Sequence, residues 1–569
     1  MPIDPADAIR PPERPPLAPT PRRHGPRRDH LDPRGARFLD PQTASRFAGQ
    51  RLQPTAYAGA GLLVRPAADG RVDEQVLTAL GAAARAEGWA VEVDEADQEV
   101  VDLARRAGVL GERHPLVVRA RLVREEGDLA PRTTPDVWPV LQRYRAGVDA
   151  PMRSAVQLQH LLTTASPDGM QPNPYVAHPY VAHPYVAHPY VAHPYVAHPA
   201  GTAAPAATAE YAQPGSGGRT PVRWVGPRPA RLTDEQLDGR RRPVVAVLDT
   251  GTGLHPWLDE VVDRTPTCGP LPIGLTDPAT DVERRGVVTG GLTGSLDIEA
   301  GHGTFVAGLV HQRCPDARIL SVRVVQPDGV IDEYDVLSAL NLLWLRQALA
   351  LVESDPDDEV DVVSMSLGYY HEDPDDADFD PLLLAPLRAL AALGVLVVTS
   401  AGNDATSRPI FPASFAPHAG GVVESTPAGE VPLVAVGALN PDGSAALFSN
   451  DGPWVRAWRP GAAVVSTVPV TFDGGGQPST RVEDAGGVRS TIDPDNFSSG
   501  FATWSGTSFA TPVLAGDLAQ RLLDDRLLDD RRRGDPPAAT TAEAERTGVR
   551  VEAAWRAVRA EAPDVEEPR

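Results

Sequence analysis

The stretch Val244-Val245-Ala246-Val247-Leu248-Asp249-Thr250-Gly251 is an apolar run that ends in a carboxylate and a glycine turn. An unbroken apolar run of this length predicts a strand that is buried on both faces, as in a parallel sheet covered by helices. Comparable apolar runs follow at 319–325, 360–367, 395–399 and 431–439. The stretch therefore predicts the first of a series of buried parallel strands.

Helical patterns alternate with these strands, at 305–312, 335–349 and 382–393. Strands and helices in alternation predict an α/β fold class, with a mostly parallel central sheet between two layers of helices. In such sheets, functional sites form beyond the carboxyl ends of the strands. Because Asp249 ends the first strand, we expect the chemistry of this protein near it.

Three more polar residues stand among small residues at strand ends or helix starts. They occur in Gly301-His302-Gly303-Thr304, in Ser400-Ala401-Gly402-Asn403 and in Gly506-Thr507-Ser508-Phe509-Ala510-Thr511-Pro512. Taken singly, each has an ordinary structural explanation, such as a helix N-cap for Ser508 or a core position for His302. Asp, His, Asn and Ser in this order, each at an element boundary, together favour a nucleophilic site.

The four motifs resemble those of the subtilisin-like (subtilase) serine proteases, in which Asp-Thr-Gly, His-Gly-Thr, Ala-Gly-Asn and Gly-Thr-Ser-Phe-Ala-Thr-Pro carry catalysis. The order Asp, His, Ser along the chain is also the order of that family. The resemblance implies a three-layer subtilisin-like domain. It also implies a serine endopeptidase that hydrolyses extended polypeptides through an acyl-enzyme intermediate.

This resemblance assigns a role to each residue. A serine hydroxyl is a poor nucleophile at neutral pH, so His302 would take the proton of Ser508 as Ser508 attacks. Asp249 would hold the imidazole in the correct tautomer and stabilise its cation. The Asn403 amide and the backbone N–H of Ser508 would stabilise the oxyanion. No cofactor is required. Calcium is common in the family, but no loop here has a ligand pattern that justifies assigning a metal residue.

The resemblance also marks Ser364-Met365-Ser366-Leu367-Gly368 as the substrate strand, to which a peptide adds through main-chain hydrogen bonds. We therefore expect protein or peptide substrates in an extended conformation. An acidic insertion follows at 371–380. At the rim of the cleft it would favour Arg or Lys near the scissile bond, whereas the alternative is a solvated loop.

The chain before this domain divides into three parts. Residues 1–52 are rich in Pro and Arg and are expected to form a disordered arm. Residues 57–165 predict an α+β module, with strands at 61–64, 90–93 and 116–123 and helices at 76–84, 137–144 and 156–162. Its position resembles that of a subtilase propeptide, which folds as a compact unit and inhibits the enzyme. A module that senses a partner is the alternative.

A linker at 166–221 contains five Pro-Tyr-Val-Ala-His repeats between residues 174 and 198. The proline in every unit blocks helix and strand, so a semi-rigid spacer is expected, with metal binding or pH sensing by its histidines as the alternative. The catalytic domain is expected at 222–530. A charged tail is expected at 531–569, with a helix near 541–560.

Composition restricts the possible partners and location. The net charge of −23 disfavours a general nucleic-acid binder, because phosphate neutralisation needs clustered cations, so no nucleic-acid partner is expected. Cys268 and Cys314 are the only cysteines, too few for a disulfide framework or a zinc quartet. No signal peptide or membrane-spanning run is visible, so we expect a cytoplasmic monomer without membrane partners, or a secreted protein if the start is mis-assigned.

A second hypothesis comes from another functional class. The chain would then be a catalytically silent subtilase-fold protein that uses its N-terminal module and repeats to scaffold partners. Loss of Asp249, His302, Asn403 or Ser508 would favour that hypothesis. All four are present.

Overall fold

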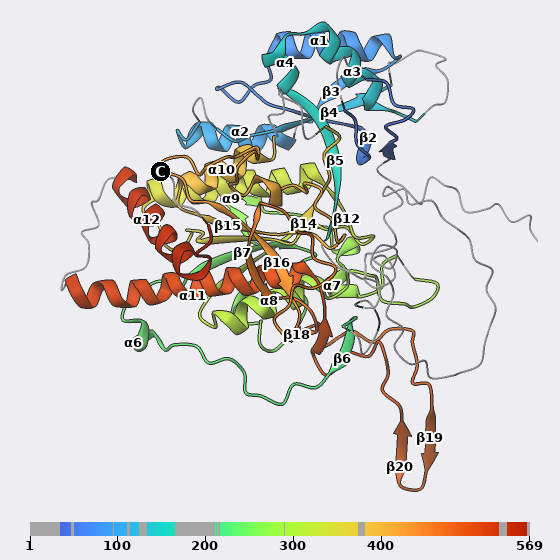
Figure 1. Ribbon diagram of the computed structural model, residues 1–569, viewed down its shortest axis with the longest axis vertical. Helices are drawn as coiled ribbons and strands as arrows, with labels where there is room; N and C mark the ends of the chain where they lie inside the picture. Colours follow the sequence, from blue (N-terminus) through green and yellow to red (C-terminus); the bar gives the residue numbers. More distant parts are fainter. Residues whose placement is uncertain are drawn as a thin grey trace, which may run out of the picture.

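The computed structural model describes residues 35–46, 51–94, 96–110, 114–124, 134–164, 211, 213, 217–289, 291–373, 382–533 and 543–565. The five repeats and the first 34 residues lie outside these ranges. Two bodies are visible in Figure 1, a smaller one built from the N-terminal part of the chain and a larger one built from the rest. We call the smaller body, residues 35–164, the N-terminal module.

The larger body is built on a seven-stranded sheet in the order β17-β16-β15-β13-β7-β11-β8. Every pairing in this sheet is parallel, which confirms the predicted parallel sheet. Its strands are β7 (Val244–Asp249), β8 (Val262–Asp263), β11 (Arg318–Arg323), β13 (Val362–Met365), β15 (Leu396–Ser400), β16 (Leu433–Leu439) and β17 (Val455–Pro460).

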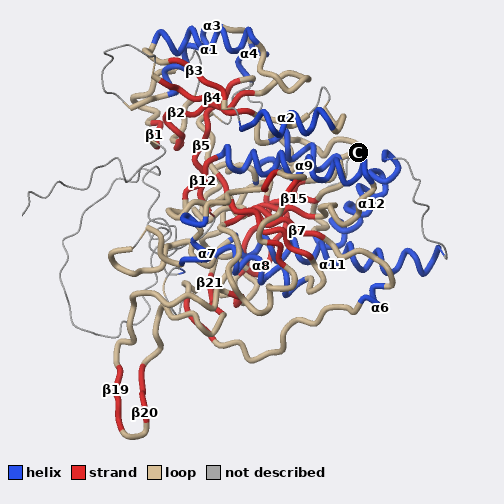
Figure 2. Tube along the Cα trace, turned by 180° about the vertical axis from the view of Figure 1, so that it is seen from behind, coloured by secondary structure: helices blue, strands red, loops and turns tan. Residues whose placement is uncertain are grey.

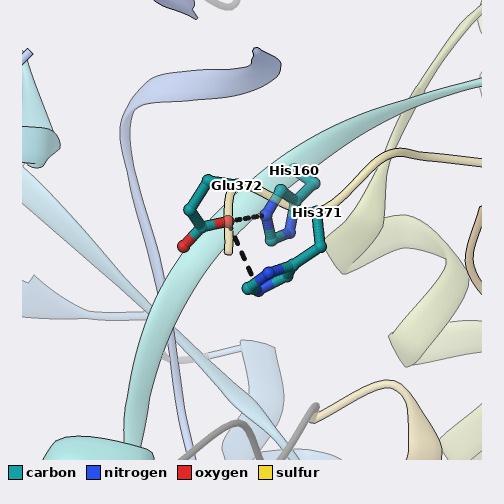
Figure 3. A group of neighbouring side chains, drawn as sticks. All are labelled: His160, His371 and Glu372. Atoms are coloured by element: carbon teal, nitrogen blue, oxygen red, sulfur yellow. Dashed lines mark hydrogen bonds and ion pairs between the residues drawn. The ribbon is translucent and has the colours of Figure 1, made fainter. Parts of the chain in front are cut away.

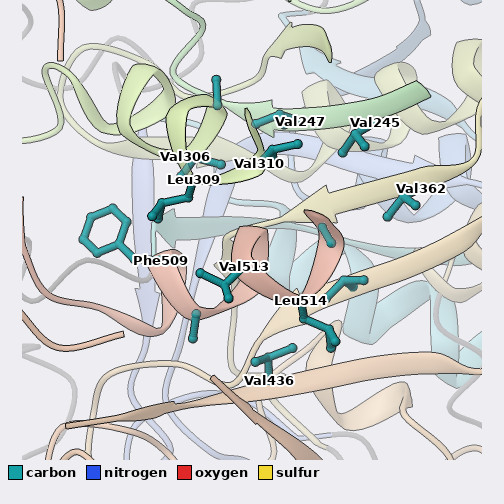
Figure 4. Close-up of a cluster of buried hydrophobic side chains, with 14 of the residues drawn as sticks. Val245, Val247, Val306, Leu309, Val310, Val362, Val436, Phe509, Val513 and Leu514 are labelled. Atoms are coloured by element: carbon teal, nitrogen blue, oxygen red, sulfur yellow. The ribbon is translucent and has the colours of Figure 1, made fainter. Parts of the chain in front are cut away.

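Helices cover both faces of this sheet, and β7 shows why its sequence is apolar without alternation. Val245 and Val247 face a core cluster formed with α8 (His302–Arg313) and α11 (Thr507–Arg533) (Figure 4). The intervening residues of β7 belong to a second cluster formed with α9 (Glu333–Glu353) and α10 (Leu384–Ala392). Both faces of the strand are therefore buried, as expected in a three-layer α/β domain.

Two helices lie near the C-terminal end of the chain, and the second agrees with the helix expected near 541–560. The helix that begins at the Ser508 motif continues as α11 to Arg533, through a charged stretch that the sequence pattern had not marked as helical. The last helix, α12 (Glu543–Glu561), packs on the larger body, and its Trp555 belongs to the same core cluster as Val245. The C-terminal segment thus forms part of the protein core rather than a solvated tail.

Helix α9 is long and apolar enough to cross a membrane when judged by length and composition alone. However, 78% of its most apolar window is buried inside the protein. Its side chains, among them Leu340 and Leu343, pack against the central sheet. Its apolar character is explained by this core position.

The N-terminal module is a sheet flanked by helices. Its elements are β1 (Ala36–Leu39), β2 (Thr55–Val64), α1 (Glu74–Ala86), β3 (Ala90–Val93), α2 (Ala96–Arg106), β4 (Val118–Val123), α3 (Val137–Gly147), α4 (Ala150–Ser154) and β5 (Val156–Thr164). Helices α1 and α3 pack on one face of this sheet, while α2 lies toward α9 of the larger body (Figure 1). Strand β1 pairs with β2, although the sequence placed it within the disordered arm.

The prediction of a helix at 156–162 is wrong, because these residues form β5. Leucines at 158, 161 and 162 have helical spacing, but nearly every residue of β5 is buried and the strand has partners along its whole length. It pairs with β2 inside the module and then continues into the larger body (Figure 1). There it pairs with β12 (Val330–Asp332) and β14 (Leu367–Gly368).

Shorter elements complete the larger body. They are β6 (Thr220–Val222), α6 (Asp234–Leu237), β9 (Thr267–Cys268), β10 (Leu271–Pro272), α7 (Val282–Arg285), β18 (Val464–Thr467), β19 (Arg481–Asp484), β20 (Gly487–Ser490) and β21 (Phe501–Trp504). The β19–β20 hairpin stands away from the body (Figure 2).

Candidate functional site

Asp249 and His302 form a buried charge pair at the carboxyl edge of the central sheet. Asp249 is the last residue of β7, and His302 is the first residue of α8. The His302 Nδ1 lies 2.7 Å from Asp249 Oδ1. A carboxylate can only accept a hydrogen bond, so Nδ1 carries the proton. A Cβ atom on Gly303 would lie 2.1 Å from the Gly251 carbonyl oxygen, so only glycine lets α8 approach the turn after Asp249 this closely.

Ser508 is the second residue of α11, and several segments converge on the start of this helix. The Thr507 backbone N–H and hydroxyl both donate to Asn403 Oδ1, over 3.0 Å and 2.9 Å. The Ser366 hydroxyl donates to the Ser508 carbonyl over 2.9 Å. The imidazole ring of His302 lies 5.1 Å from the ring of Phe509. Residues separated by long stretches of sequence are thus gathered around Ser508.

The second ring nitrogen of His302, Nε2, is buried and has no hydrogen-bond partner among the residues that the structure describes. A buried polar atom without a partner is costly, and such atoms in native proteins are often found at sites of chemistry. Burial alone would lower the pKa of His302, but the charge and hydrogen bond of Asp249, with the charges of Glu299 and Glu283, raise the pKa to about 9. When neutral, this histidine presents a lone pair at Nε2.

One buried residue next to the Asp249–His302 pair, Glu283, is not predicted from the sequence. Glu283 lies in the four-residue helix α7 and contacts both the turn after Asp249 and the start of α8. No motif or hydrophobic period marks this position. The only local signal is a carboxylate near the Asp249 and His302 motifs, and acidic residues are common in surface turns.

The predicted substrate strand is split between two sheets. Ser364 and Met365 lie in β13 of the central sheet, whereas Leu367 and Gly368 form β14. All of the segment, including Ser366, is buried. Strand β14 pairs antiparallel with the end of β5, with Leu367 opposite Thr164 and Gly368 opposite Thr163.

Strand β12 pairs with the same part of β5 from the other side. Its register places Val330 opposite Thr163 and Ile331 opposite Leu162. The end of β5 therefore lies between β12 and β14. The strand that was expected to hold an extended peptide is occupied by an extended segment of the protein itself.

A buried ionic cluster lies beside this junction, and Figure 3 shows three of its residues, with the Glu372 carboxylate facing both His160 and His371. His160 Nδ1 lies 2.8 Å from Glu333 Oε2, and His160 Nε2 lies 2.8 Å from Glu372 Oε2. Both carboxylates accept, so both ring nitrogens donate and His160 is a cation. Tyr369 stacks on the His160 ring with 4.3 Å between centroids. The cluster joins β5 to the larger body.

These contacts correct the prediction for the acidic insertion, at least in its first three residues. His371, Glu372 and Asp373 are buried against the N-terminal module and do not form an exposed rim or a solvated loop. The Arg145 guanidinium of α3 also lies 3.8 Å from Glu372. Residues 374–380 lie outside the described ranges.

His160, His371 and Glu372 bring three potential ligand atoms within 4.8 Å of one another. The hydrogen bonds fit an ionic network better than a metal site. The Asp373 backbone N–H donates to His371 Nδ1 over 3.0 Å, so the His371 proton is on Nε2, which lies 3.3 Å from Glu372 Oε2. A metal ion at Nε2 would have to displace this proton and leave an imidazolate.

A model of the Subtilase family matches residues 240–524. Two curated relatives are a serine protease, AprX, of Bacillus subtilis (strain 168) and an intracellular serine protease of Paenibacillus polymyxa. The first is 28% identical over 291 residues, which cover 48% of this chain and 55% of AprX. The second is 30% identical over 233 residues, which cover 38% of this chain and 52% of that protein. The chain spans about half the length of these relatives.

Solved structures are also similar to this chain. Fervidolysin from Fervidobacterium pennivorans, a keratinolytic enzyme related to subtilisin, is 19% identical, with a TM-score of 0.40, and the match covers 85% of this chain and 56% of that one. A lanthipeptide protease is 20% identical, with a TM-score of 0.33, and the match covers 54% of this chain and 78% of that one.

Proposed function

Because the chain belongs to the subtilase family, we propose that it is a serine endopeptidase that cleaves extended polypeptides through Asp249, His302 and Ser508. The observation that carries the proposal is the imidazole of His302. Its Nδ1 is bonded to Asp249. Its Nε2 is buried next to the start of the helix that bears Ser508 and has no partner within the described part of the chain. This arrangement suits a general base that takes a proton from a serine hydroxyl.

In this mechanism, His302 Nε2 takes the Ser508 hydroxyl proton as the serine oxygen attacks the substrate carbonyl. The carbonyl oxygen becomes an oxyanion, which meets the Asn403 amide and the Ser508 backbone N–H at the positive end of α11. His302 then returns the proton to the leaving amine, and the acyl-enzyme remains. A water molecule, activated by the same histidine, releases the acyl group.

We further propose that the N-terminal module holds the enzyme inactive. The end of β5 lies between β12 and β14 in antiparallel register, which is how a peptide substrate would add to these strands. The ion pairs of His160 fasten this segment to the larger body. Of the two roles left open for the module, this occupancy supports inhibition more than sensing. We further propose an autolytic cut shortly after Thr164, because the antiparallel register of β5 matches that expected of a bound substrate.

The proposal is tested on purified full-length protein and its Ser508→Ala variant. Both are incubated, examined by intact mass and N-terminal sequencing, and treated with a fluorophosphonate probe for activated serines. We expect the wild type alone to be labelled and to be cut shortly after Thr164. Cleavage of the Ser508→Ala chain at the same site would show that another protease makes the cut.

If the folded wild type stays uncut and unlabelled, two interpretations remain: an enzyme inhibited by its N-terminal module, or a scaffold without activity. We would then open the cleft in the full chain with Leu162→Asp, which places a charge at a buried position of β5. Labelling of this chain that disappears with Ser508→Ala supports the enzyme. An opened chain that keeps its helical circular dichroism but is not labelled contradicts the proposed activity and favours the scaffold.

A further inference from the structure

Glu283 is a fully buried carboxylate that belongs to none of the four motifs. Its residue is 1% exposed. It sits in the second position of α7, where the side chain of Asp281 accepts hydrogen bonds from the backbone N–H groups of Glu283 and Arg284. This cap fixes the short helix and directs the Glu283 side chain inward. A buried carboxylate is retained only when its oxygens are well supplied with donors.

The donors come from the two segments that carry the Asp249–His302 pair. Glu283 Oε1 accepts from the Thr250 hydroxyl at 2.5 Å, from the Gly301 N–H at 3.0 Å and from the Gly303 N–H at 3.2 Å. Its Oε2 accepts from the Thr304 hydroxyl at 2.5 Å. Thr250 directly follows Asp249, and the other three residues surround His302. One carboxylate therefore joins the end of β7 to the start of α8.

The Thr250 and Thr304 hydroxyls, which donate to Glu283, each also accept a hydrogen bond from the opposite segment. The Thr250 oxygen accepts from the Gly303 N–H over 2.8 Å, and the Thr304 oxygen accepts from the Gly253 N–H over 2.8 Å. Each segment thus also bonds directly to the other. Removal of Glu283 would take this acceptor from both hydroxyls and from the Gly301 N–H, whereas the Gly303 N–H would keep the Thr250 oxygen. The relative position of Asp249 and His302 would loosen as a result.

Charge gives Glu283 a second effect on the same pair. Burial raises the pKa of Glu283 to about 7, the hydrogen bonds from Thr250 and Thr304 oppose this increase, and the charges of Asp249 and Asp281 add to it. The negative charge of Glu283 in turn raises the pKa of His302. The titratable groups that face Glu283 are therefore Asp249 on β7, His302 on α8 and Asp281 on its own helix.

We propose that Glu283 is a positioning residue of the serine protease reaction, which holds the Asp249 turn against the His302 helix and adds negative charge behind the pair. This inference rests on the proposed function, because it assumes that His302 accepts the proton of Ser508. Glu283 does not reach substrate and acts through the geometry and the ionisation of His302.

The test separates charge from shape with two variants of the full chain, in the Leu162→Asp form in which the cleft is open. Glu283→Gln keeps an oxygen for the donors of the Asp249 and His302 segments but loses the charge. Glu283→Asp keeps the charge but is too short to bridge both segments. The rate of Ser508 labelling by a fluorophosphonate is measured against pH, together with thermal unfolding.

We expect Glu283→Gln to move the midpoint of the labelling profile to lower pH by about half a unit or more, because His302 loses a neighbouring negative charge. Glu283→Asp is expected to keep the midpoint and to lower the plateau rate about tenfold, because misplaced catalytic groups react more slowly. The matched control is Glu359→Gln. It removes the charge of a different, partly buried carboxylate, which pairs with Arg241 and Arg550 and is distant in sequence from Glu283. It should lower stability and leave the midpoint unchanged.

Two kinds of failure are distinguishable. If the parent chain shows no labelling that depends on Ser508, the proposed function fails and the role of Glu283 falls with it. If the parent is labelled at Ser508 but both Glu283 variants keep its midpoint and its plateau, only the role of Glu283 is overturned. Lower thermal stability with an unchanged labelling profile would likewise reduce Glu283 to a structural residue.

Discussion

In the proposed mechanism, the ionisation of His302 would set the pH at which Ser508 is activated. Asp249 and two further carboxylates overcome the effect of burial and raise the pKa of His302 to about 9. In that mechanism Asp249 would stabilise the imidazolium that forms during the reaction, but it would also make the neutral form of His302 scarce at neutral pH. A general base accepts a proton only in its neutral form. The contact between Asp249 and His302 would therefore favour proton transfer to His302 and restrict the pH range of the proposed reaction.

We predict that fluorophosphonate labelling of Ser508 in the Leu162→Asp chain increases with pH and levels off only above about pH 9, because His302 must lose a proton first. The rate is measured with buffers of constant ionic strength, and labelling of the Ser508→Ala chain is subtracted. A profile that is already level at about pH 7 would contradict this ionisation of His302.

At the scale of the secondary-structure elements, one buried carboxylate, that of Asp361, forms hydrogen bonds to several strands and helices of the larger body. Asp361, directly before β13, accepts two hydrogen bonds from Arg241, one from Arg526 of α11 and one from the Val244 N–H of β7. Although burial alone would raise it, the charges of Arg241, Arg526 and Arg550 hold the pKa of Asp361 well below its ordinary value. Asp361 thus links four elements, namely β13, β7, α11 and, through Arg550, α12.

Asp361→Asn is predicted to destabilise the protein by about 3 kcal/mol or more, because it leaves buried guanidinium groups without their anion. A lowered pKa in the folded state means that the stabilisation is present above the unfolded pKa, about 3.9, and is lost as pH falls further. Denaturant unfolding should therefore show the largest difference from wild type near neutral pH. Asp357→Asn, at an exposed site, is the control and should change little.

Trp555 is the largest of several side chains through which helix α12 contacts the larger body. Trp555 is 7% exposed and donates through Nε1 to the Glu430 carbonyl over 3.0 Å. Trp555→Ala is predicted to cost about 3 kcal/mol, because it leaves a cavity and an unpaired carbonyl. Val549→Ala on the exposed face of the helix is the control. Equal unfolding midpoints for the two variants would show that α12 contributes little to the core.

At the scale of the whole molecule, the N-terminal module and the larger body share one sheet through β5 and one ionic cluster through His160. Burial alone would lower the pKa of His160, but Glu333 and Glu372 raise it to about 9. The pKa values of its neighbours His371 and Glu372 are lowered instead. Burial lowers the pKa of His371 to about 3, and His371, His160 and Arg145 hold the pKa of Glu372 far below its ordinary value despite its burial. Docking of the module is therefore linked to a proton on His160.

The direction of this dependence follows from the raised pKa. The contribution of His160 to docking is fully present below its undocked pKa of about 6.5 and is lost as pH rises through about 9. Glu372 contributes above its ordinary pKa and loses its contribution in stronger acid. We predict that docking is strongest in mildly acidic solution and about a hundredfold weaker in alkaline solution.

Hydrogen exchange of β5 in the uncut Ser508→Ala chain, corrected for intrinsic exchange rates, measures this docking. Protection of β5 should fall between about pH 6.5 and pH 9.5 while protection of α8 does not. In the His160→Gln, Ser508→Ala chain, protection of β5 should be low throughout. His418→Gln is the control, since His418 bonds to the Ala416 carbonyl of its own segment. If the protection of β5 changed with pH in the same way in all three chains, docking would not depend on the proton on His160.

The sequence by itself determined the α/β class and the four motifs, because both depend on short-range properties. Val244–Leu248 reads as a doubly buried strand from its own residues, and the glycines around His302 mark a close approach. The triad roles came from the resemblance, since Asp249, His302 and Ser508 are far apart in sequence. Membership of the subtilase family confirms the resemblance, while the roles themselves stay predictions.

Only the tertiary structure decided how β5, Glu283 and His160 are used. A strand needs partners, and those of β5 are Val330–Asp332 and Leu367–Gly368, far along the chain, so its leucine spacing alone wrongly predicted a helix. The side chains of Glu283 and His160 look like ordinary polar groups in sequence. Their partners arrive from separate segments, and a buried charge acquires its role from those partners rather than from its neighbours in the chain.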